Sequence, residues 1–253
     1  MKVAPKKHLG QHFLVDENIL RVIERLADLD QSDVVLEIGP GLGVLTRFLA
    51  ERVAYVHAVE LDRSLEGELR GLQRTELHWG DALALDLGAL EPPSNKLVSN
   101  LPYNVATPIV VESLDRLPAV QRWCVMVQRE VADRFSAEPG TKAYGAVSVL
   151  LQLATERTGF HPVSREVFRP RPNVDSALVA FRRTAPGIEP RVKRVVEASF
   201  AHRRKTLANS LALTGVAARD HAIAALAAID RGATVRAEEL APGDFVALAA
   251  ALG

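Results

Sequence analysis

The sequence is poor in cysteine, with Cys124 as the only one among 253 residues. A single thiol excludes a disulfide framework and a zinc site built from several cysteines, and it favours a reducing compartment. Cys124 lies in the apolar run 123–127, so we expect a buried free thiol with a structural role.

Long apolar segments and a net charge are also absent. No uninterrupted apolar run approaches the ~20 residues that a membrane-spanning helix needs. Residues 1–8 carry positive charge but lack the apolar stretch of a secretory signal. The 31 Lys and Arg residues balance the 31 Asp and Glu residues, which argues against a uniformly basic nucleic-acid-binding protein. We expect a cytoplasmic protein without a membrane partner, and nothing indicates more than a monomer.

The charge is nevertheless uneven along the chain. Between Phe160 and Ser210, eleven Lys and Arg residues stand against four Asp and Glu residues, a local excess of seven positive charges. One strongly basic segment in a neutral protein indicates an anionic partner that meets one face of the molecule.

Short β-rich runs alternate with helical patterns in the first half of the chain. Strands are expected at 34–38, 55–59, 76–79, around Leu97 and at 122–127. Helices are expected after the N-cap Asp16, around Leu45, from about Arg63 to Gln73, and at 107–114 and 129–135. This alternation predicts an α/β fold with a doubly wound parallel sheet.

The second half of the chain has a different pattern. The runs 153–163 and 174–182 are separated only by a loop, which favours an antiparallel hairpin. Residues 184–190 read as a linker, and only helical patterns follow it. We expect a main domain over residues 1–185 and a small all-helical domain over residues 186–253.

Four residues suited to ligand binding follow successive predicted strands: Gly39, Glu60, Asp81 and Asn100. Ligands bind at the carboxyl ends of the strands in open α/β sheets. Glu60 can accept hydrogen bonds from both hydroxyls of a ribose. Asp81 can accept one from an adenine amino group, with Ala82 offering apolar contact.

The glycine loop is Glu37-Ile38-Gly39-Pro40-Gly41-Leu42-Gly43. Glycine allows a ligand to approach the backbone closely, but the third glycine comes one residue too early for the dinucleotide fingerprint. The set fits S-adenosylmethionine, a nucleoside without phosphates. A dinucleotide such as NAD, and a tight turn with solvated acids, remain as alternatives.

The tetrapeptide Asn100-Leu101-Pro102-Tyr103 suits alkylation of an exocyclic amine on a nucleobase. The lone pair of adenine N6 is delocalised into the ring, and two acceptors gripping its N–H bonds would localise it. The Asn100 side chain offers one acceptor, and the Leu101 carbonyl, held by Pro102, offers a second. Tyr103 offers a flat face for an unstacked base. A strand followed by a proline turn with a core tyrosine is the alternative.

These motifs and several others resemble the small-subunit (16S) rRNA adenine N6,N6-dimethyltransferases of the KsgA/RsmA type along nearly the whole chain. The matching segments are 9–14, 37–46, 59–62, 80–82, 100–108, 168–176 and 199–207. The resemblance implies a Rossmann-like class I methyltransferase sheet and a methyl donor, S-adenosylmethionine. It implies dimethylation of N6 of two adjacent adenosines near the 3′ end of 16S rRNA, within the immature 30S subunit, during ribosome biogenesis.

By similarity, one group of residues holds the cofactor: His12, Leu14, Gly39, Gly41, Glu60, Asp81, Ala82 and Asn100. The family usually has asparagine where His12 stands, although a backbone contact would survive there. Asn100 to Tyr103 would hold the target base, with Phe168 bordering its pocket. RNA phosphates would meet Lys6, Lys7, Arg169, Arg171, Arg203, Arg204 and Lys205. If residues 200–211 form one helix, the last three of these cations cannot cover one patch.

A sulfonium methyl is already activated, so the reaction needs alignment and no metal. We find no catalytic histidine, and His57 and His78 are expected to be structural. One alternative is a 23S rRNA methyltransferase of the macrolide-resistance type, although the segment 203–206 resembles the 16S enzymes. Others are a nicotinamide oxidoreductase and a non-catalytic ribosome-assembly factor.

Overall fold

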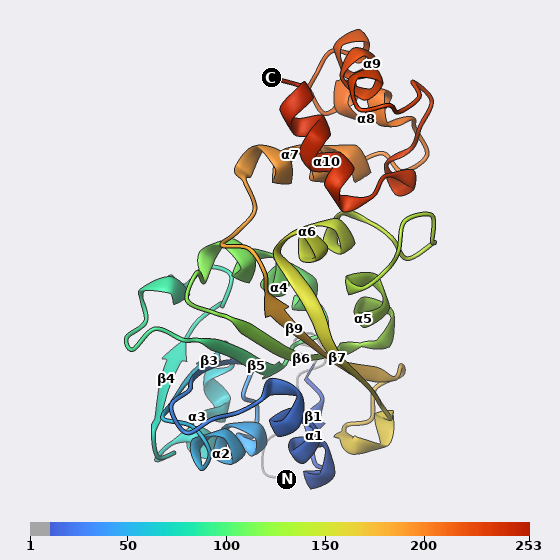
Figure 1. The fold of residues 1–253 in the computed structure, drawn as a ribbon. Helices are drawn as coiled ribbons and strands as arrows, with labels where there is room; N and C mark the ends of the chain where they lie inside the picture. Colours follow the sequence, from blue (N-terminus) through green and yellow to red (C-terminus); the bar gives the residue numbers. More distant parts are fainter. Residues whose placement is uncertain (1–10) are drawn as a thin grey trace. The chain divides into compact units, whose positions relative to one another are not determined.

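A computed structural model of the protein describes residues 11–253. Its main sheet has the strand order β4-β3-β2-β5-β6-β9-β7 (Figure 1). These strands are β2 (Val34–Ile38), β3 (Tyr55–Glu60), β4 (Thr75–Trp79), β5 (Lys96–Asn100), β6 (Arg122–Gln128), β7 (Thr155–Val163) and β9 (Ser176–Arg183). The strands β2 to β6 pair in parallel, and β9 is antiparallel to β6. The predicted α/β sheet is therefore confirmed.

The strand order reverses at β2, which lies between β3 and β5. The chain moves outward from β2 through β3 to β4, and then returns to the other side of β2 with β5. Such a switch point leaves a crevice at the carboxyl ends of the strands, because the loops on its two sides lead away from each other. The glycine loop after β2 lies at this point.

Helices cover both faces of the sheet, with α1, α2 and α3 on one side and α4 on the other (Figure 1). Their bounds are α1 (Glu17–Ala27), α2 (Val44–Ala50), α3 (Glu66–Leu69) and α4 (Ala106–Arg116). The predicted N-cap of α1 is confirmed, because the Asp16 carboxylate accepts from the backbone N–H of Asn18. The expected helix from Arg63 to Gln73 is wrong in length. It is a 3-10 turn followed by α3, and the backbone is already extended at Arg70.

A second, two-stranded sheet ties the start of the described chain to a distant loop. The strand β1 (Phe13–Leu14) pairs antiparallel with β8 (Phe168–Arg169), and the Val15 N–H donates to the Val167 carbonyl at 2.9 Å. The turn between β7 and β9 therefore anchors residues 11–15. Residues 13–14 and 168–169, from two separate sequence motifs, are therefore neighbours in space.

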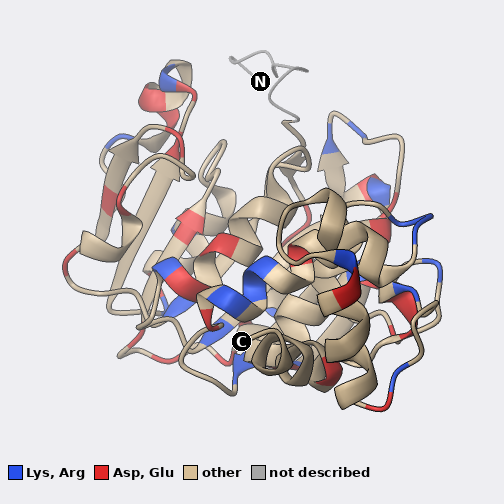
Figure 2. Ribbon diagram, turned by 90° about the horizontal axis from the view of Figure 1, so that it is seen from above, with Lys and Arg blue, Asp and Glu red and all other residues tan. Residues whose placement is uncertain are grey.

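The structure divides into two compact units. Of the described residues, the first unit comprises 11–132 together with Glu156–Arg183, and the second comprises Asp133–Thr155 and Thr184–Gly253. The second unit contains α6 (Ala146–Ala154), α7 (Pro190–Phe200), α8 (Leu207–Leu213), α9 (Arg219–Ala228) and α10 (Pro242–Ala251). Lys and Arg are interspersed with Asp and Glu in both units (Figure 2).

Residues 133–155 pack with the second unit, which differs from the domain limits expected from the sequence. Helix α6 is strongly apolar and contacts α7 and α10. The Tyr144 hydroxyl donates to the Leu240 carbonyl at 2.8 Å, and its ring meets Phe200 edge-on at 5.9 Å. Burial of this apolar segment against later helices sets the division, which no local sequence signal marks.

Residues 200–211 do not form one helix. Helix α7 ends at Phe200, and α8 begins after Thr206, whose side chain caps it by accepting from the Asn209 N–H at 3.4 Å. The basic residues at 203–205 lie in the intervening turn. Their directions are therefore not set by the faces of a helix, contrary to the expectation from the sequence.

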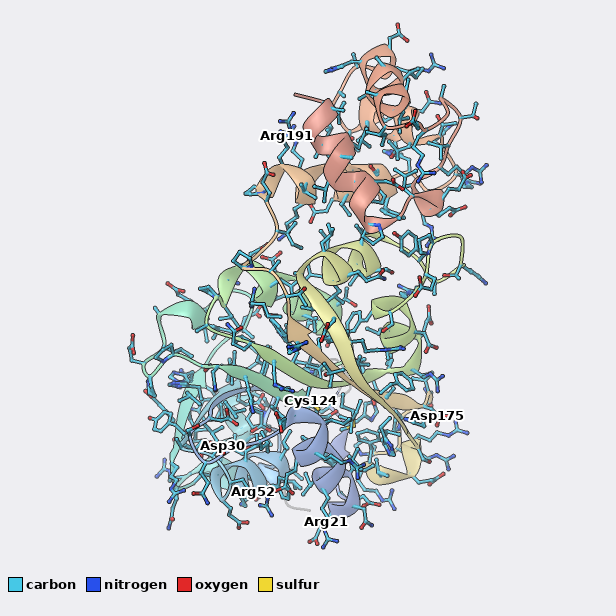
Figure 3. The ribbon with its side chains drawn as sticks, in the orientation of Figure 1. Arg21, Asp30, Arg52, Cys124, Asp175 and Arg191 are labelled. Carbon is cyan, nitrogen blue, oxygen red and sulfur yellow. The ribbon has the colours of Figure 1, made fainter. Side chains whose placement is uncertain are left out.

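Cys124 lies among the strands of the sheet (Figure 3) and is buried, as predicted. Burial raises the pKa of its thiol to about 12, so it stays protonated and unreactive at neutral pH. Among residues 11–253, no helix combines the length and the apolar character needed to cross a bilayer.

Candidate active site at the carboxyl ends of the strands

A hollow of about 150 Å³ lies at the switch point of the first unit. The ends of β2, β3 and β5 and the turn after β4 form its floor and walls, and residues 11–14 lie against it. The four residues singled out at the strand ends, Gly39, Glu60, Asp81 and Asn100, all line it. The structure therefore gathers the predicted constellation at one place.

Two glycines make the loop after β2 compatible with this hollow. Gly39 and Gly41 have φ angles of 76° and 60°, in the left-handed region that side chains disfavour. A Cβ on Gly41 would lie 2.8 Å from the Phe13 ring, and one on Gly39 would lie 3.2 Å from Pro102. The loop therefore packs closely against Phe13 of β1 and against Pro102 of the tetrapeptide 100–103.

Glu60 organises the backbone around the hollow. Its Oε2 accepts from the Gly41 N–H at 3.1 Å, and its Oε1 accepts from the Asp62 N–H at 2.8 Å. Burial raises the pKa of Glu60, while these two hydrogen bonds oppose the shift by favouring the charged form. A carboxylate has about four acceptor positions. Glu60 therefore keeps acceptor capacity for hydroxyl groups of a ligand.

Asp81 and Ala82 follow β4 at the side of the hollow. Asp81 is exposed, and its Oδ1 accepts from the Leu83 N–H at 2.9 Å, which orients the carboxylate. The Gly80 N–H donates to the Glu60 carbonyl and continues the pairing of β3 with β4 into the turn. One acid and one small apolar residue thus border the same opening.

Asn100 presents an acceptor that no described residue uses. Its Nδ2 donates to the His12 carbonyl at 3.1 Å, which sets the orientation of the amide. Its Oδ1 is buried and has no hydrogen-bond partner among residues 11–253. Because a buried acceptor without a partner costs free energy, this oxygen points to a ligand donor as its partner.

The rest of the tetrapeptide is held in place by the sheet and the next helix. Leu101 is buried, and its N–H donates to the Met126 carbonyl of β6 at 3.1 Å. The Pro102 carbonyl accepts from the Val105 N–H at 3.1 Å, just before α4. The backbone that carries the Leu101 carbonyl is thereby fixed.

Tyr103 is anchored at its hydroxyl and has an aromatic neighbour. Its hydroxyl shares a hydrogen bond with Ser176 Oγ at 2.5 Å, and burial raises the pKa of the phenol. The His12 ring stacks on the Tyr103 ring, with 5.3 Å between centroids and 29° between planes. The His12 Nδ1 lies 2.8 Å from the Pro170 carbonyl. His12 therefore contributes its backbone to Asn100 and its ring to Tyr103.

Not all predicted residues lie in this hollow. Phe168 is fully buried in the hydrophobic core beside Leu14 and does not line the hollow, because its side chain packs toward the sheet. Arg169 and Arg171 are exposed, and the Arg171 guanidinium pairs with Glu166 at 2.8 Å. That Phe168 borders the pocket of the target base stays a prediction.

The remaining predicted cations belong elsewhere. Arg203, Arg204 and Lys205 lie in the second unit and are exposed. Arg203 donates to the Lys142 and Tyr144 carbonyls, both at 3.2 Å. Lys6 and Lys7 lie outside the described residues.

The structure adds Glu37 to the site, a residue that the sequence pattern marked only as part of the glycine loop. Glu37 lines the hollow, and its Oε2 has no partner among the described residues. Burial raises its pKa to about 8, with the neighbouring Thr46 hydroxyl opposing the shift, so the carboxyl is largely protonated at pH 7. The sequence did contain a signal for Glu37, because burying an acid in the otherwise apolar strand 34–38 costs free energy and therefore indicates a function.

Comparison with known proteins agrees with this geometry. The family model for ribosomal RNA adenine dimethylase matches residues 3–250. A curated relative from Rubrobacter xylanophilus, named ribosomal RNA small subunit methyltransferase A, is 50% identical over 250 residues, covering 96% of this chain and 94% of the relative. A relative of the same name from Kineococcus radiotolerans is 45% identical, covering 99% of this chain and 87% of its own length.

Solved structures share the fold. A dimethyladenosine transferase from Plasmodium falciparum superposes with a TM-score of 0.78 at 23% identity, covering 94% of this chain and 96% of the other. The 23S rRNA methyltransferase ErmE superposes with a TM-score of 0.65 at 28% identity, covering 95% and 99%.

The family match spans almost the whole chain, and the family's methyl donor, S-adenosylmethionine, is the ligand that the strand-end acids and glycines suit. A buried carboxylate suited to ribose hydroxyls and a glycine loop without a phosphate cradle fit that nucleoside. The chain belongs to the ribosomal RNA adenine dimethylase family.

Proposed function

We propose that this enzyme methylates N6 of two adjacent adenosines near the 3′ end of 16S rRNA, in the immature 30S subunit, as a cytoplasmic monomer. The names of the curated relatives support a small-subunit substrate. The observation that carries the chemistry is the Asn100 Oδ1, a buried acceptor without a partner among the described residues, on the same hollow as the Tyr103 ring. An adenine amino group is a donor that suits it.

The donor-binding residues follow from the layout of the hollow. S-adenosylmethionine supplies a sulfonium-bound methyl group that is already activated for attack. Glu60 would accept from the ribose hydroxyls, and Asp81 from the adenine amino group, with Ala82 against the ring. The backbone near the ligand would come from His12, Leu14, Gly39 and Gly41. Each of these residues lines the hollow.

The tetrapeptide would align the target amine. The Asn100 Oδ1 and the Leu101 carbonyl accept from the two N6–H groups, which localises the nitrogen lone pair toward the methyl carbon. The donor would supply its methyl carbon to this nitrogen and leave as a neutral thioether with the electron pair of the broken carbon–sulfur bond, and the amine would lose its proton to water. Tyr103 supports the unstacked base, and its hydroxyl bond to Ser176 keeps the ring in place.

Gly41→Ala tests whether the close approach of the loop to Phe13 shapes the donor site. The positive φ costs about 1–2 kcal/mol for a non-glycine residue, and the added Cβ would displace the Phe13 ring, which lies 2.8 Å away. We expect S-adenosylmethionine affinity to fall about tenfold or more, equivalent to about 1.4 kcal/mol, by isothermal titration calorimetry.

Gly71→Ala is the matched control for that variant. Gly71 also has a positive φ, of 79°, but a Cβ added there would meet no atom within 4 Å, and the residue is outside the hollow. Gly71→Ala should lower the thermal midpoint, as Gly41→Ala does through its positive φ, but it should bind S-adenosylmethionine with wild-type affinity. Equal affinity in both variants would contradict the role given to the Gly41 contact.

The target is tested by incubating the enzyme and labelled S-adenosylmethionine with unmethylated 30S subunits, and separately with unmethylated 50S subunits. We expect label on two adjacent adenosines near the 3′ end of 16S rRNA. Label confined to 23S rRNA would overturn the proposed substrate and favour the activity named for the structural relative ErmE. Gel filtration and light scattering of the purified enzyme test the monomeric state.

A further inference from the structure

A cluster of two histidines and a glutamate lies on the outer strands of the sheet, away from the residues of the hollow. The parallel register of β3 with β4 pairs His57 with Glu76 and Val59 with His78. Residues two apart on a strand share a face, so His57, Glu76 and His78 project on the same side. The sheet therefore assembles three potential metal ligands that are up to 21 residues apart.

The three ligand atoms are spaced as a small divalent ion requires. His57 Nδ1 lies 3.0 Å from His78 Nε2, and Glu76 Oε2 lies 3.8 Å and 3.9 Å from these two nitrogens. The point in their plane that is equidistant from all three lies about 2.1 Å from each, which matches zinc–nitrogen and zinc–oxygen bond lengths of about 2.0–2.2 Å. Tetrahedral coordination at this bond length needs ligand atoms about 3.4 Å apart, so the two nitrogens would separate by about 0.4 Å and the Glu76 oxygen would approach each of them by about 0.4–0.5 Å.

Outer contacts orient the ligands. His57 Nε2 lies 2.9 Å from the Pro92 carbonyl, which can only accept, so Nε2 carries the proton and Nδ1 presents its lone pair. The Tyr55 hydroxyl donates to Glu76 Oε2 at 3.2 Å. A histidine bound through one nitrogen and held through the other by a backbone carbonyl is the usual arrangement around protein-bound zinc.

Solvent can reach the cluster from one side. The side chain of His57 is fully buried, that of His78 is 17% exposed and that of Glu76 is 49% exposed. An ion can therefore enter past Glu76, and water can complete its coordination.

We propose that His57, Glu76 and His78 form a zinc-binding site, with His57 Nδ1, His78 Nε2 and one Glu76 oxygen as ligands and water as the fourth. Two imidazoles favour zinc over magnesium or calcium, which prefer oxygen ligands. On zinc binding the proton on His78 Nε2 gives way to the metal, and Nδ1 carries the remaining proton. The ion would fasten the edge strand β4 to β3.

The position of this site gives it a consequence for the donor pocket. His78 is three residues before Asp81, and β4 ends at Trp79 between them. An edge strand has only one neighbouring strand to hold it. Zinc at the proposed site would therefore stabilise the strand whose end carries Asp81, without touching the reacting groups.

The test is calorimetric titration of the full chain with zinc chloride after removal of metals by a chelator. We expect one saturable equivalent, and an affinity at least tenfold weaker in His78→Gln and in Glu76→Gln. At a zinc concentration one hundred times the wild-type dissociation constant, the thermal midpoint of the wild type should rise by about 5 °C or more, and those of the two cluster variants should rise less. Cobalt(II) in place of zinc should give the visible absorption of a four-coordinate site.

His221→Gln is the control, because His221 is an exposed histidine of the second unit. It should bind zinc as the wild type does. The proposal is overturned if the wild type takes up no saturable equivalent, or if both cluster variants bind zinc with wild-type affinity. The wild-type titration decides the first outcome even if a cluster variant fails to fold, and circular dichroism identifies such a variant. If the proposal is overturned, His57 and His78 are a hydrogen-bonded pair with a structural role.

Discussion

Asn100→Ala is expected to lower the rate of methyl transfer by at least about a thousandfold while the protein stays folded. Removing one preorganised group that acts on the reacting atoms costs about 10²–10³ in rate, and here the same change also releases the His12 carbonyl from Asn100 Nδ2. The measurement is single-turnover transfer to unmethylated 30S subunits, with circular dichroism and thermal unfolding to establish the fold.

The stability of this variant should change little, because removing a buried acceptor that has no partner among the described residues offsets the loss of the hydrogen bond from Asn100 Nδ2 to the His12 carbonyl. Asn100→Asp separates the two roles of the amide. It keeps acceptor oxygens for the target amine but cannot donate to His12, so its rate should lie between those of the wild type and Asn100→Ala. A wild-type rate in Asn100→Ala would refute the proposed grip on the amine.

Glu60→Gln is expected to weaken S-adenosylmethionine binding by about 10- to 100-fold. Hydrogen bonds to a charged group contribute about 1.5–3 kcal/mol, and each 1.4 kcal/mol is a tenfold change in affinity. Glutamine keeps the size of the side chain but offers one acceptor oxygen, and its amide group would face a backbone N–H of Gly41 or Asp62. Isothermal titration calorimetry gives the affinity.

Glu51→Gln is the control for the loss of one negative charge. Glu51 is exposed after α2, pairs with Arg52 at 3.1 Å and does not line the hollow. It should bind the cofactor as the wild type does, and thermal unfolding will show whether Glu60→Gln has shifted the loop. Unchanged affinity in a folded Glu60→Gln variant would remove Glu60 from the ribose site.

The clustering of the site residues was predictable, because parallel strands place their carboxyl ends at one edge of the sheet. Gly39, Glu60, Asp81 and Asn100 are separated by about twenty residues each, yet periodicity and topology were enough to bring them together. The shortened helix at 63–69 was not predictable in this way. Its weak apolar pattern marked no end point, although Gly71, with a φ of 79°, is a residue type that commonly ends a helix.

Contacts between segments far apart in the sequence could be identified only from the three-dimensional structure. The sequence places Phe168 in a basic motif, and only the pairing of β8 with β1 shows that its ring lies in the core. His12 meets Tyr103 for the same reason, because that pairing carries residues 11–14 to the hollow. Neither contact is visible in local periodicity.

The α/β alternation, the strand-end site and the family could all be read from the amino-acid sequence, since they depend on short-range pattern and on specific motifs. Three findings came from the folded chain alone: the unpaired Asn100 Oδ1 among the described residues, the packing of residues 133–155 with the second unit, and the convergence of His57, Glu76 and His78. Strand register and burial depend on residues far apart in the chain. A residue's partners therefore cannot be read from its neighbours in sequence.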